Sequence, residues 1–285
     1  MNTGKEVLHL FVSELSDRYG AEEAAAIFRF LVSDRWKTEG AQWRMRLEFP
    51  LSEEDENWLQ YCLNSLKKGI PVQYVAGFAW FGPLKLKVNE AVLIPRPETE
   101  ELCDWVLQQS WKDHLRVVDA CTGSGCIPLF FKHMKPSWQI MGFDISDDAL
   151  QVAKDNAIAL QLDVTFHKHD LSGDKSLLPE ADLILSNPPY VPLEESVTLM
   201  EHVVAHEPSL ALFAPEGDPL YFYRHLESYA REKLAPGGQL FMEIHKDYGE
   251  ETRELFTFEP WASARCINDI HGKPRFIHVV RQCAE

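Results

Sequence analysis

Four consecutive residues in the second half of the chain, Asn187-Pro188-Pro189-Tyr190, have the types and order that suit the binding of a flat NH2 group. The side-chain oxygen of Asn187 and the backbone oxygen of Pro188 can each accept one N–H, which orients the lone pair of the nitrogen. The two prolines restrain the backbone, and Tyr190 can pack against the flat group. A rigid turn at the end of a strand is the alternative interpretation.

The chemistry that these residues support is the transfer of a methyl group to the nitrogen of an amide or of an exocyclic amine. Such a nitrogen is a weak nucleophile because its lone pair is delocalised, so it must be held in line with the methyl carbon. No strong base is required, because the nitrogen loses its proton readily once it is positively charged. We therefore predict Asn187, Pro188, Pro189 and Tyr190 as the catalytic residues, without a histidine or glutamate as a base.

A glycine turn is the candidate site for binding the methyl donor. An apolar run that ends at Asp119 is followed by Gly123-Ser124-Gly125, where glycine lets the backbone approach a ligand without a Cβ atom in the way. The third glycine of the dinucleotide fingerprint is missing, so a plain glycine turn is an open alternative. The residues predicted to bind the cofactor here are Asp119, Cys121, Thr122, Gly123, Ser124 and Gly125.

Two acidic residues after later predicted strands extend this candidate cofactor site. Asp144 can accept hydrogen bonds from both ribose hydroxyls of a nucleoside. Its alternative role is a helix N-cap, although Ser146 or Asp147 can fill that position. Asp170 can accept a hydrogen bond from an adenine amino group, with Leu171 against the ring, or it is an ordinary loop residue. Their positions at successive strand ends favour the cofactor-binding interpretation.

Alternating strands and helices from residue 97 onward must position these groups. Strands are predicted at 115–119, 139–143, 164–166, 181–185, 240–244 and 276–280, and helices at 127–131, 147–157 and 221–234. Such alternation is typical of a doubly wound α/β sheet, in which ligands bind at the carboxyl ends of the strands.

The first part of the chain has a different pattern, with apolar residues at helical spacing. Apolar residues then alternate on both sides of Gly82-Pro83, which predicts a β-hairpin. We therefore predict a helical domain over residues 1–70, a linker hairpin over 71–95 and an α/β catalytic domain over 96–285.

Composition and charge restrict the classes of partner. The 285 residues are 45% hydrophobic and carry a formal net charge of -16, which disfavours nucleic acid as a direct partner and suits a basic protein surface. The six cysteines show no zinc-binding spacing, and no metal site is predicted. The sequence shows neither a signal peptide nor an apolar run of about 20 residues, so we expect a soluble, cytoplasmic protein without membrane contact.

Further motifs become informative when their order along the chain is considered. These motifs are Leu93-Ile94-Pro95-Arg96-Pro97-Glu98-Thr99-Glu100, Thr122-Gly123-Ser124-Gly125-Cys126-Ile127, Asp144-Ile145-Ser146, Asn187-Pro188-Pro189-Tyr190, and Glu207-Pro208 with Ala211-Leu212. Together they resemble the HemK/PrmC family of peptide chain release factor glutamine methyltransferases. The resemblance spans about residues 71–275, and the helical start is similar only in kind to that family's substrate-recognition domain.

The resemblance implies a particular activity and fold. Members of the family bind S-adenosylmethionine at positions matching 121–125, Asp144, Leu171 and Asn187. They methylate the glutamine of the Gly-Gly-Gln motif in class-1 release factors, and positions matching 187–190 hold that glutamine. Their catalytic domain is a Rossmann-like, class I methyltransferase sheet of seven strands with one antiparallel strand, in which the first and fourth strands are neighbours.

The sequence departs from the family pattern at Cys121, Pro219 and His245, where glycine is usual. The Cys121 side chain stands where the backbone normally approaches the cofactor, which predicts weaker cofactor binding. Arg96 is expected either to contact a ligand or to form a surface salt bridge. Glu207 is expected to be an exposed loop acid, with support of the Asn187 loop as the alternative role.

Three alternative functions are considered. The first is a glutamine methyltransferase for a ribosomal protein, the second is an adenine-N6 methyltransferase of nucleic acid, and the third is a cofactor-binding scaffold without activity. The net charge argues against the second, and the intact residues 187–190 argue against the third.

Overall fold

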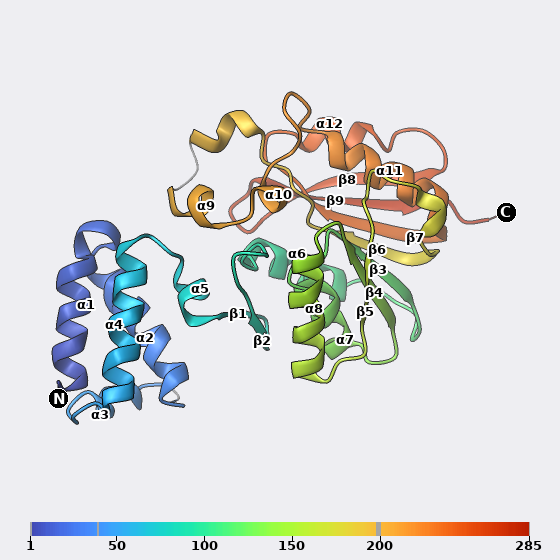
Figure 1. Cartoon of the computed structure of the whole chain (residues 1–285). Coiled ribbons are helices and arrows are strands. Elements are labelled where there is room, and N and C mark those ends of the chain that lie inside the picture. The colour runs from blue at the N-terminus through green and yellow to red at the C-terminus, as the bar shows by residue number, and fades with distance from the viewer. Residues whose placement is uncertain (1, 39, 198–200, 285) are drawn as a thin grey trace. The chain divides into compact units, whose positions relative to one another are not determined.

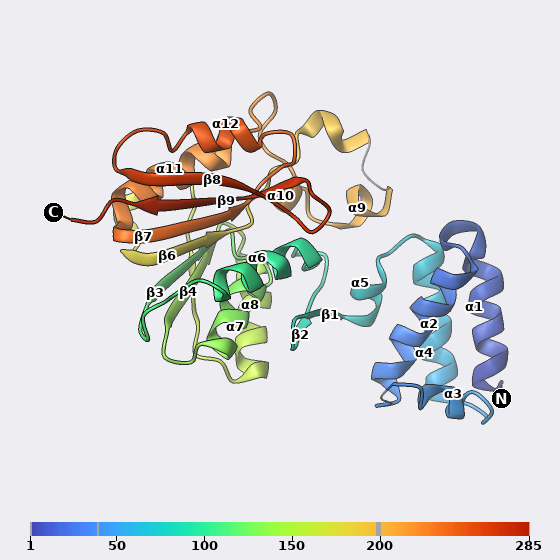
Figure 2. The same ribbon diagram turned by 180° about the vertical axis from the view of Figure 1, so that it is seen from behind.

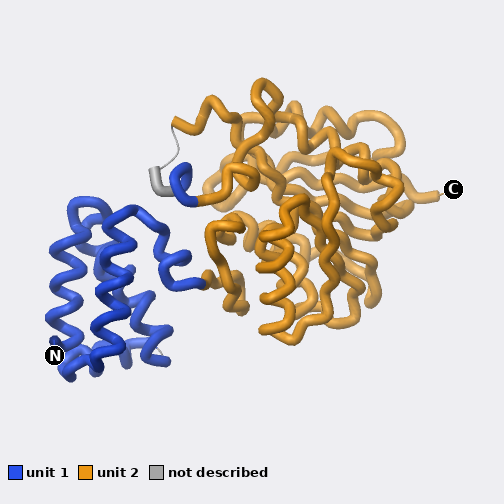
Figure 3. Tube along the Cα trace, in the orientation of Figure 1, with its two compact units in different colours: residues 1–77, 201–206 blue, residues 78–200, 207–285 orange. Residues whose placement is uncertain are grey.

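The computed structural model describes residues 2–38, 40–197 and 201–284. The chain divides into two compact units, which are residues 1–77 with 201–206 and residues 78–200 with 207–285 (Figure 3). The boundary between the two units in this part of the chain therefore follows Gly77. The domain limits at residues 70 and 95 stay a prediction.

Helices form the first unit, as the apolar spacing predicted. They are α1 (Gly4–Tyr19), α2 (Ala21–Arg35), α3 (Trp43–Arg46), α4 (Glu53–Lys67), α5 (Val72–Ala76) and α9 (Glu201–His206). Thr3 and Ser52 cap α1 and α4 by accepting backbone N–H groups of the first turn. Fully buried Phe11, Phe28 and Leu59 lie in the core of this unit.

A hairpin of two strands, β1 (Phe78–Phe81) and β2 (Leu84–Lys87), opens the second unit. The hairpin prediction is right for these two strands, but it is wrong for the preceding residues, which form helix α5. Pro71 precedes the single turn of α5, and Gly77 ends it in the left-handed conformation with φ of 78°. The alternating apolar residues before Gly77 therefore belong to a short helix and not to a strand.

A seven-stranded sheet forms the centre of the second unit within the described residues (Figures 1 and 2). Its strands are β3 (Arg116–Ala120), β4 (Gln139–Asp144), β5 (Thr165–Lys168), β6 (Ala181–Ser186), β7 (Leu234–Glu243), β8 (Trp261–Asn268) and β9 (Pro274–Arg281). They lie in the order β5-β4-β3-β6-β7-β9-β8. The strands from β5 to β7 pair in parallel, and β9 pairs antiparallel with both neighbours. This topology confirms the Rossmann-like prediction.

Helices cover both faces of the sheet (Figure 1). They are α6 (Pro97–Leu107), α7 (Cys126–Met134) and α8 (Asp147–Leu160) on one face, and α11 (Tyr221–Lys233) and α12 (Gly249–Glu254) on the other. Val117 packs in the core with α6, α7 and α8, and the next residue, Val118, packs in the core with α11. Because both faces are covered, the middles of the inner strands are apolar, as in Val117-Val118 of β3 and Leu183-Ile184-Leu185 of β6.

Two elements near the end of the chain were not predicted from the sequence. Strand β8 lies at the edge of the sheet and consists mostly of exposed and half-buried residues, so it lacks an apolar run. Helix α12 has only six residues. Strand β7 also begins earlier than predicted, at Leu234, so the expected helix-ending segment Pro236-Gly237-Gly238 lies within the strand.

The remaining helical segments of the second unit are short. They are η1 (Lys175–Leu177), η2 (Leu193–Val197) and α10 (Ser209–Leu212). Across the described residues, no helix combines the length and the apolar character needed to cross a membrane.

Candidate active site

The ends of β3 and β6 bring the two predicted motifs together. These strands are parallel neighbours, with Ala120 opposite Ser186. The Ser186 hydroxyl donates a hydrogen bond to the Ala120 carbonyl oxygen at 2.8 Å. The glycine turn after β3 and Asn187 after β6 therefore lie side by side, as the family resemblance implied.

Backbone conformation explains the glycines of the turn. Gly123 has φ of 52° and Gly125 has φ of 78°, a region that residues with a Cβ atom rarely adopt. A Cβ atom at Gly125 would lie 3.1 Å from side-chain atoms of Ala153 and Phe166, whereas at Gly123 it would meet no atom within 4 Å. Gly125 is therefore required for packing, and Gly123 faces open space.

Asp144 is hydrogen-bonded to the glycine turn. Its carboxylate accepts the backbone N–H of Gly123 at 2.9 Å and that of Ser146 at 3.0 Å. Ser146 itself caps α8 by accepting the N–H of Ala149, so Asp144 is not the N-cap. Burial raises the pKa of Asp144, and the backbone hydrogen bonds oppose this shift. The turn thus has a carboxylate in a fixed position beside it.

The third predicted strand end contributes Asp170 and Leu171. Oδ1 of Asp170 accepts both the N–H of Ser172 at 2.8 Å and its hydroxyl at 2.7 Å. Leu171 is buried. Oδ2 is therefore the oxygen of Asp170 that is available for the predicted hydrogen bond from an adenine amino group.

A cavity of about 320 Å³ opens at these strand ends within the second unit. The predicted residues that line it are 121–124, Asp144, Asp170, Leu171, Asn187 and Pro189. The predicted residues outside its lining are Asp119, Gly125, Pro188 and Tyr190. Ile145 and Leu210 are exposed and form apolar parts of the cavity wall. The sequence interpretation did not include them. The position of an isoleucine directly after Asp144 was a signal that could have identified Ile145. The contacts that each residue makes with a ligand stay predictions.

Three buried polar side chains around the glycine turn have no hydrogen-bond partner among the described residues. They are the carboxylate of Asp119 and the hydroxyls of Thr122 and Ser124. A buried polar group without a partner costs free energy. Thr122 and Ser124 line the cavity, so their hydroxyls suit a ligand that brings donors and acceptors, whereas Asp119 lies outside the lining. Together with apolar walls and the Asp144 carboxylate, these groups fit a cofactor that contains a nucleoside.

Asp119 is fully buried beneath the turn, and burial raises its pKa to about 8. In an unfolded chain the same group ionises at about pH 4. Between these two values the folded state binds one proton more than the unfolded state. The free energy of unfolding therefore falls as the pH rises, by up to about 1.4 kcal/mol per pH unit.

We expect Asp119→Asn to remove this pH dependence from the ligand-free protein. The unfolding free energy of the wild type minus that of the variant should decrease steadily from about pH 5 to about pH 8, as measured by urea unfolding. Asp163→Asn replaces an exposed acid and is the matched control. Parallel pH profiles for the wild type and Asp119→Asn would contradict this expectation.

Cys121 stands in the turn where glycine was expected. Its φ is 61°, a left-handed conformation that costs a residue with a Cβ atom roughly 1–2 kcal/mol. Burial raises the pKa of its thiol, so the side chain is neutral.

We expect Cys121→Gly to lower the dissociation constant for S-adenosylmethionine about fivefold, because the backbone can then approach the ligand. Titration calorimetry measures this change, with exposed Cys283→Ala as control, and an unchanged or weaker affinity would contradict it.

A buried chain of hydrogen bonds holds Asn187 and Tyr190. The Asn187 Nδ2 donates to the Thr99 hydroxyl at 2.9 Å, and that hydroxyl donates to Glu243 at 2.7 Å. The Tyr190 hydroxyl donates to the other oxygen of Glu243 at 2.9 Å. Thr99 and Glu243 are 2% and 1% exposed. Both ends of the 187–190 segment are therefore tied to one buried acid.

The sequence interpretation assigned no role to Thr99 or Glu243. Glu243 had a usable signal, because it is an acid within the apolar run that predicted a strand at 240–244, and a buried acid needs partners. Thr99 belongs to the motif 93–100 of the resemblance, but its residue type gave no signal of its own, because a threonine in the first turn of a helix such as α6 is ordinary.

Glu207 is buried, so the expectation of an exposed loop acid is wrong. One of its carboxylate oxygens accepts the N–H of Ile94 at 3.1 Å, and the other pairs with Arg96 at 2.6 Å. Arg96 therefore forms a salt bridge with a buried acid and not on the surface. Arg96 also lines the cavity, so its expected contact with a ligand stays a prediction. The pair fixes the segment that leads into α6 and Thr99.

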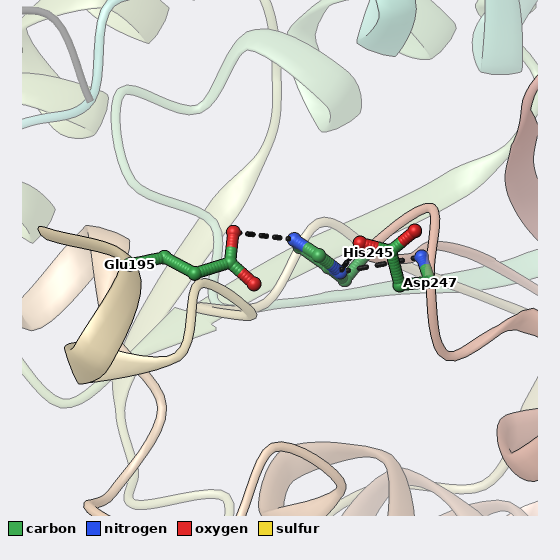
Figure 4. Close-up of side chains that lie close together, drawn as sticks. All are labelled: Glu195, His245 and Asp247. Carbon is green, nitrogen blue, oxygen red and sulfur yellow. Dashed lines mark hydrogen bonds and ion pairs between the residues drawn. The ribbon is translucent and has the colours of Figure 1, made fainter. Parts of the chain in front are cut away.

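Glu195, His245 and Asp247 form a cluster whose potential ligand atoms lie within 4.8 Å of one another (Figure 4). His245 Nε2 lies 3.2 Å from Glu195, and its Nδ1 accepts the backbone N–H of Asp247 at 3.3 Å. Protein atoms thus engage both ring nitrogens, and Lys246 pairs with Asp247. This arrangement fits a hydrogen-bonded histidine, and the expectation of no metal site stays a prediction.

The fold and the cavity together define the class of the protein. A mostly parallel sheet with one reversed strand, and a nucleoside-sized cavity at its carboxyl edge, are features of a class I methyltransferase. A methyltransferase from Pyrococcus furiosus has a similar fold, with a TM-score of 0.52 over 81% of this chain and 100% of that chain. The two are 14% identical, so this likeness shows the fold alone.

Sequence comparisons identify the family within this class. Residues 103–218 match the methyltransferase small domain, and residues 6–77 match the PrmC N-terminal domain. A release factor glutamine methyltransferase of Bacteroides thetaiotaomicron is 36% identical over 264 residues, which cover 92% of this chain and 95% of that protein. One of Flavobacterium psychrophilum is 38% identical over 221 residues, which cover 76% and 78%. The chain belongs to the release factor glutamine methyltransferase family, which confirms the resemblance.

Proposed function

We propose that the protein transfers a methyl group from S-adenosylmethionine to the side-chain amide nitrogen of the glutamine in the Gly-Gly-Gln motif of class-1 peptide chain release factors. The observation that carries this proposal is the orientation of Asn187. Its Nδ2 donates to Thr99, so its Oδ1 is the atom left to accept an N–H from a substrate amide at the cavity. Relatives named release factor glutamine methyltransferase support the proposal.

The residues of the chain bind the cofactor and orient the amide. When bound, S-adenosylmethionine would supply a methyl carbon from a positively charged sulfur, which would leave as a neutral thioether as the carbon–nitrogen bond forms. Asp144, which lies beside the glycine turn, would accept hydrogen bonds from the ribose hydroxyls. Asn187 Oδ1 and the Pro188 carbonyl oxygen each accept one N–H of the glutamine amide, which directs its lone pair and stabilises the positive charge that develops on the nitrogen. The nitrogen then releases a proton to water, so no side chain acts as a base.

A protein substrate suits the charge of the chain. The net charge of -16 repels nucleic acid at long range and attracts a basic protein surface. The proposal therefore includes no direct contact with nucleic acid or a membrane, and it places the protein in the cytoplasm with its release factor substrate.

Mass spectrometry of a class-1 release factor, incubated with the protein and S-adenosylmethionine, tests the proposal. The glutamine of Gly-Gly-Gln should gain one methyl group, and a release factor that carries Gly-Gly-Ala should gain none. Ribosomal proteins, DNA and RNA are incubated in parallel. Methylation of one of these substrates, without methylation of the release factor, would contradict the proposal.

A further inference from the structure

We propose that Thr99 and Glu243 are positioning residues, which fix the side chains of Asn187 and Tyr190 in the orientation that receives the glutamine amide. This inference rests on the proposed function, because it explains how that function's substrate-binding groups are oriented. It assigns a role to two buried residues of α6 and β7 that the reaction does not otherwise use.

The direction of the hydrogen bonds follows from the chemistry of Glu243. An ionised carboxylate only accepts hydrogen bonds, so the Thr99 hydroxyl gives its single proton to Glu243. The Thr99 oxygen must then accept from Asn187, which directs Nδ2 toward Thr99 and Oδ1 to the opposite side of the amide. Glu243, at the end of this series of hydrogen bonds, therefore determines which atom of Asn187 faces the substrate.

Burial has the largest effect on Glu243 and raises its pKa, and the nearby acid Glu98 raises it further. The hydroxyls of Thr99 and Tyr190 and the positive charge of Arg275 oppose this shift. Each carboxylate oxygen accepts one hydroxyl, at 2.7 Å and 2.9 Å, so neither is left without a partner. The same acid thus orients the first and the last residue of the 187–190 segment.

A reversed Asn187 amide would present Nδ2 to the substrate. Two N–H donors would then face each other, and the Pro188 oxygen would be left to hold the glutamine amide. A side-chain amide distinguishes its two ends only through its partners, because nitrogen and oxygen have almost the same size. Loss of the Thr99 hydroxyl removes this distinction while the shape of the site is kept.

Thr99→Val removes the hydroxyl and keeps the volume of the side chain. We expect kcat for release factor methylation to fall about 100-fold, while KM for the release factor and the dissociation constant for S-adenosylmethionine change by less than about threefold. The effect falls on kcat because the orientation of the amide matters most when the nitrogen reacts. Thr99→Ser keeps the hydroxyl and should restore kcat to within about threefold of the wild type.

Thr252→Val is the matched control for the loss of a buried threonine hydroxyl. Thr252 is fully buried in α12, donates to the Tyr248 carbonyl oxygen at 2.6 Å and does not line the cavity. The kcat of the Thr252→Val variant should equal that of the wild type. An equal loss of kcat in Thr252→Val, or a wild-type kcat in a folded Thr99→Val, would overturn the inference.

Glu243→Gln tests the other end of this series of hydrogen bonds. It also tests the positioning role on its own if Thr99→Val does not fold. A glutamine amide can donate to Thr99, which permits the reversed orientation of Asn187 and should lower kcat at least about tenfold. A wild-type kcat in this variant would overturn the inference. Failure of the proposed function is recognised separately, because the wild-type protein itself would then leave the release factor unmethylated.

Discussion

Replacing Asn187 by alanine should lower kcat for glutamine methylation about 1000-fold and change the dissociation constant for S-adenosylmethionine by less than about threefold. The Asn187 side chain supplies one of the two oxygens that hold the amide. Loss of one fixed group that acts on developing charge typically costs about 100-fold to 1000-fold, and the nitrogen also loses its alignment. Single-turnover transfer of a labelled methyl group measures the rate, and titration calorimetry measures cofactor binding.

Asn268→Ala is the matched control for this variant. Asn268 also lies at the end of a strand, β8, but it is exposed and does not line the cavity, so its replacement should leave the rate unchanged. Circular dichroism establishes that both variants fold. A rate for Asn187→Ala within about threefold of the wild type would place the reacting amide elsewhere.

A second large effect is expected at Asp144, on cofactor affinity. Asp144→Ala should raise the dissociation constant for S-adenosylmethionine about 100-fold, because hydrogen bonds to a charged acceptor contribute roughly 1.5–3 kcal/mol each. The variant also removes the acceptor that holds the Gly123 N–H at 2.9 Å, so the turn loses part of its support. Titration calorimetry on ligand-free protein measures the change.

Asp148→Ala controls for the removal of an acid from the same region. Asp148 is exposed in the first turn of α8, and its replacement should leave the affinity unchanged. At saturating cofactor, kcat of Asp144→Ala should stay within about tenfold of the wild type, since the groups that hold the amide are intact. An unchanged dissociation constant in Asp144→Ala would show that the ribose lies elsewhere.

Local sequence patterns predicted the alternating elements of the α/β unit because each inner strand is an apolar run bounded by turn residues. The predicted strand at 139–143, for example, corresponds to β4 (Gln139–Asp144). The pattern failed where burial was partial or the element short. The edge strand β8 has no apolar run, and α5 is a single turn whose apolar residues also fit a strand.

The glycine turn was predictable for a different reason, which is conformational. Gly123 and Gly125 adopt positive φ, and glycine is the residue that tolerates it without strain. Cys121 adopts the same region with a side chain, so a rule based on glycine alone would not have located all three positions. The local motif placed Cys121 between the strand and the two glycines, but it did not predict that Cys121 adopts the left-handed conformation.

The sequence by itself predicted which groups bind a cofactor and an NH2 group, because the chemistry of Asn187 and Asp144 lies in their residue types and in their places after strands. Only the tertiary structure decided which atom of Asn187 faces the cavity. That choice depends on Thr99, 88 residues from Asn187, and on Glu243, 144 residues from Thr99. Hydrogen bonds over such separations form because α6, β6 and β7 pack together, and no local pattern encodes that packing.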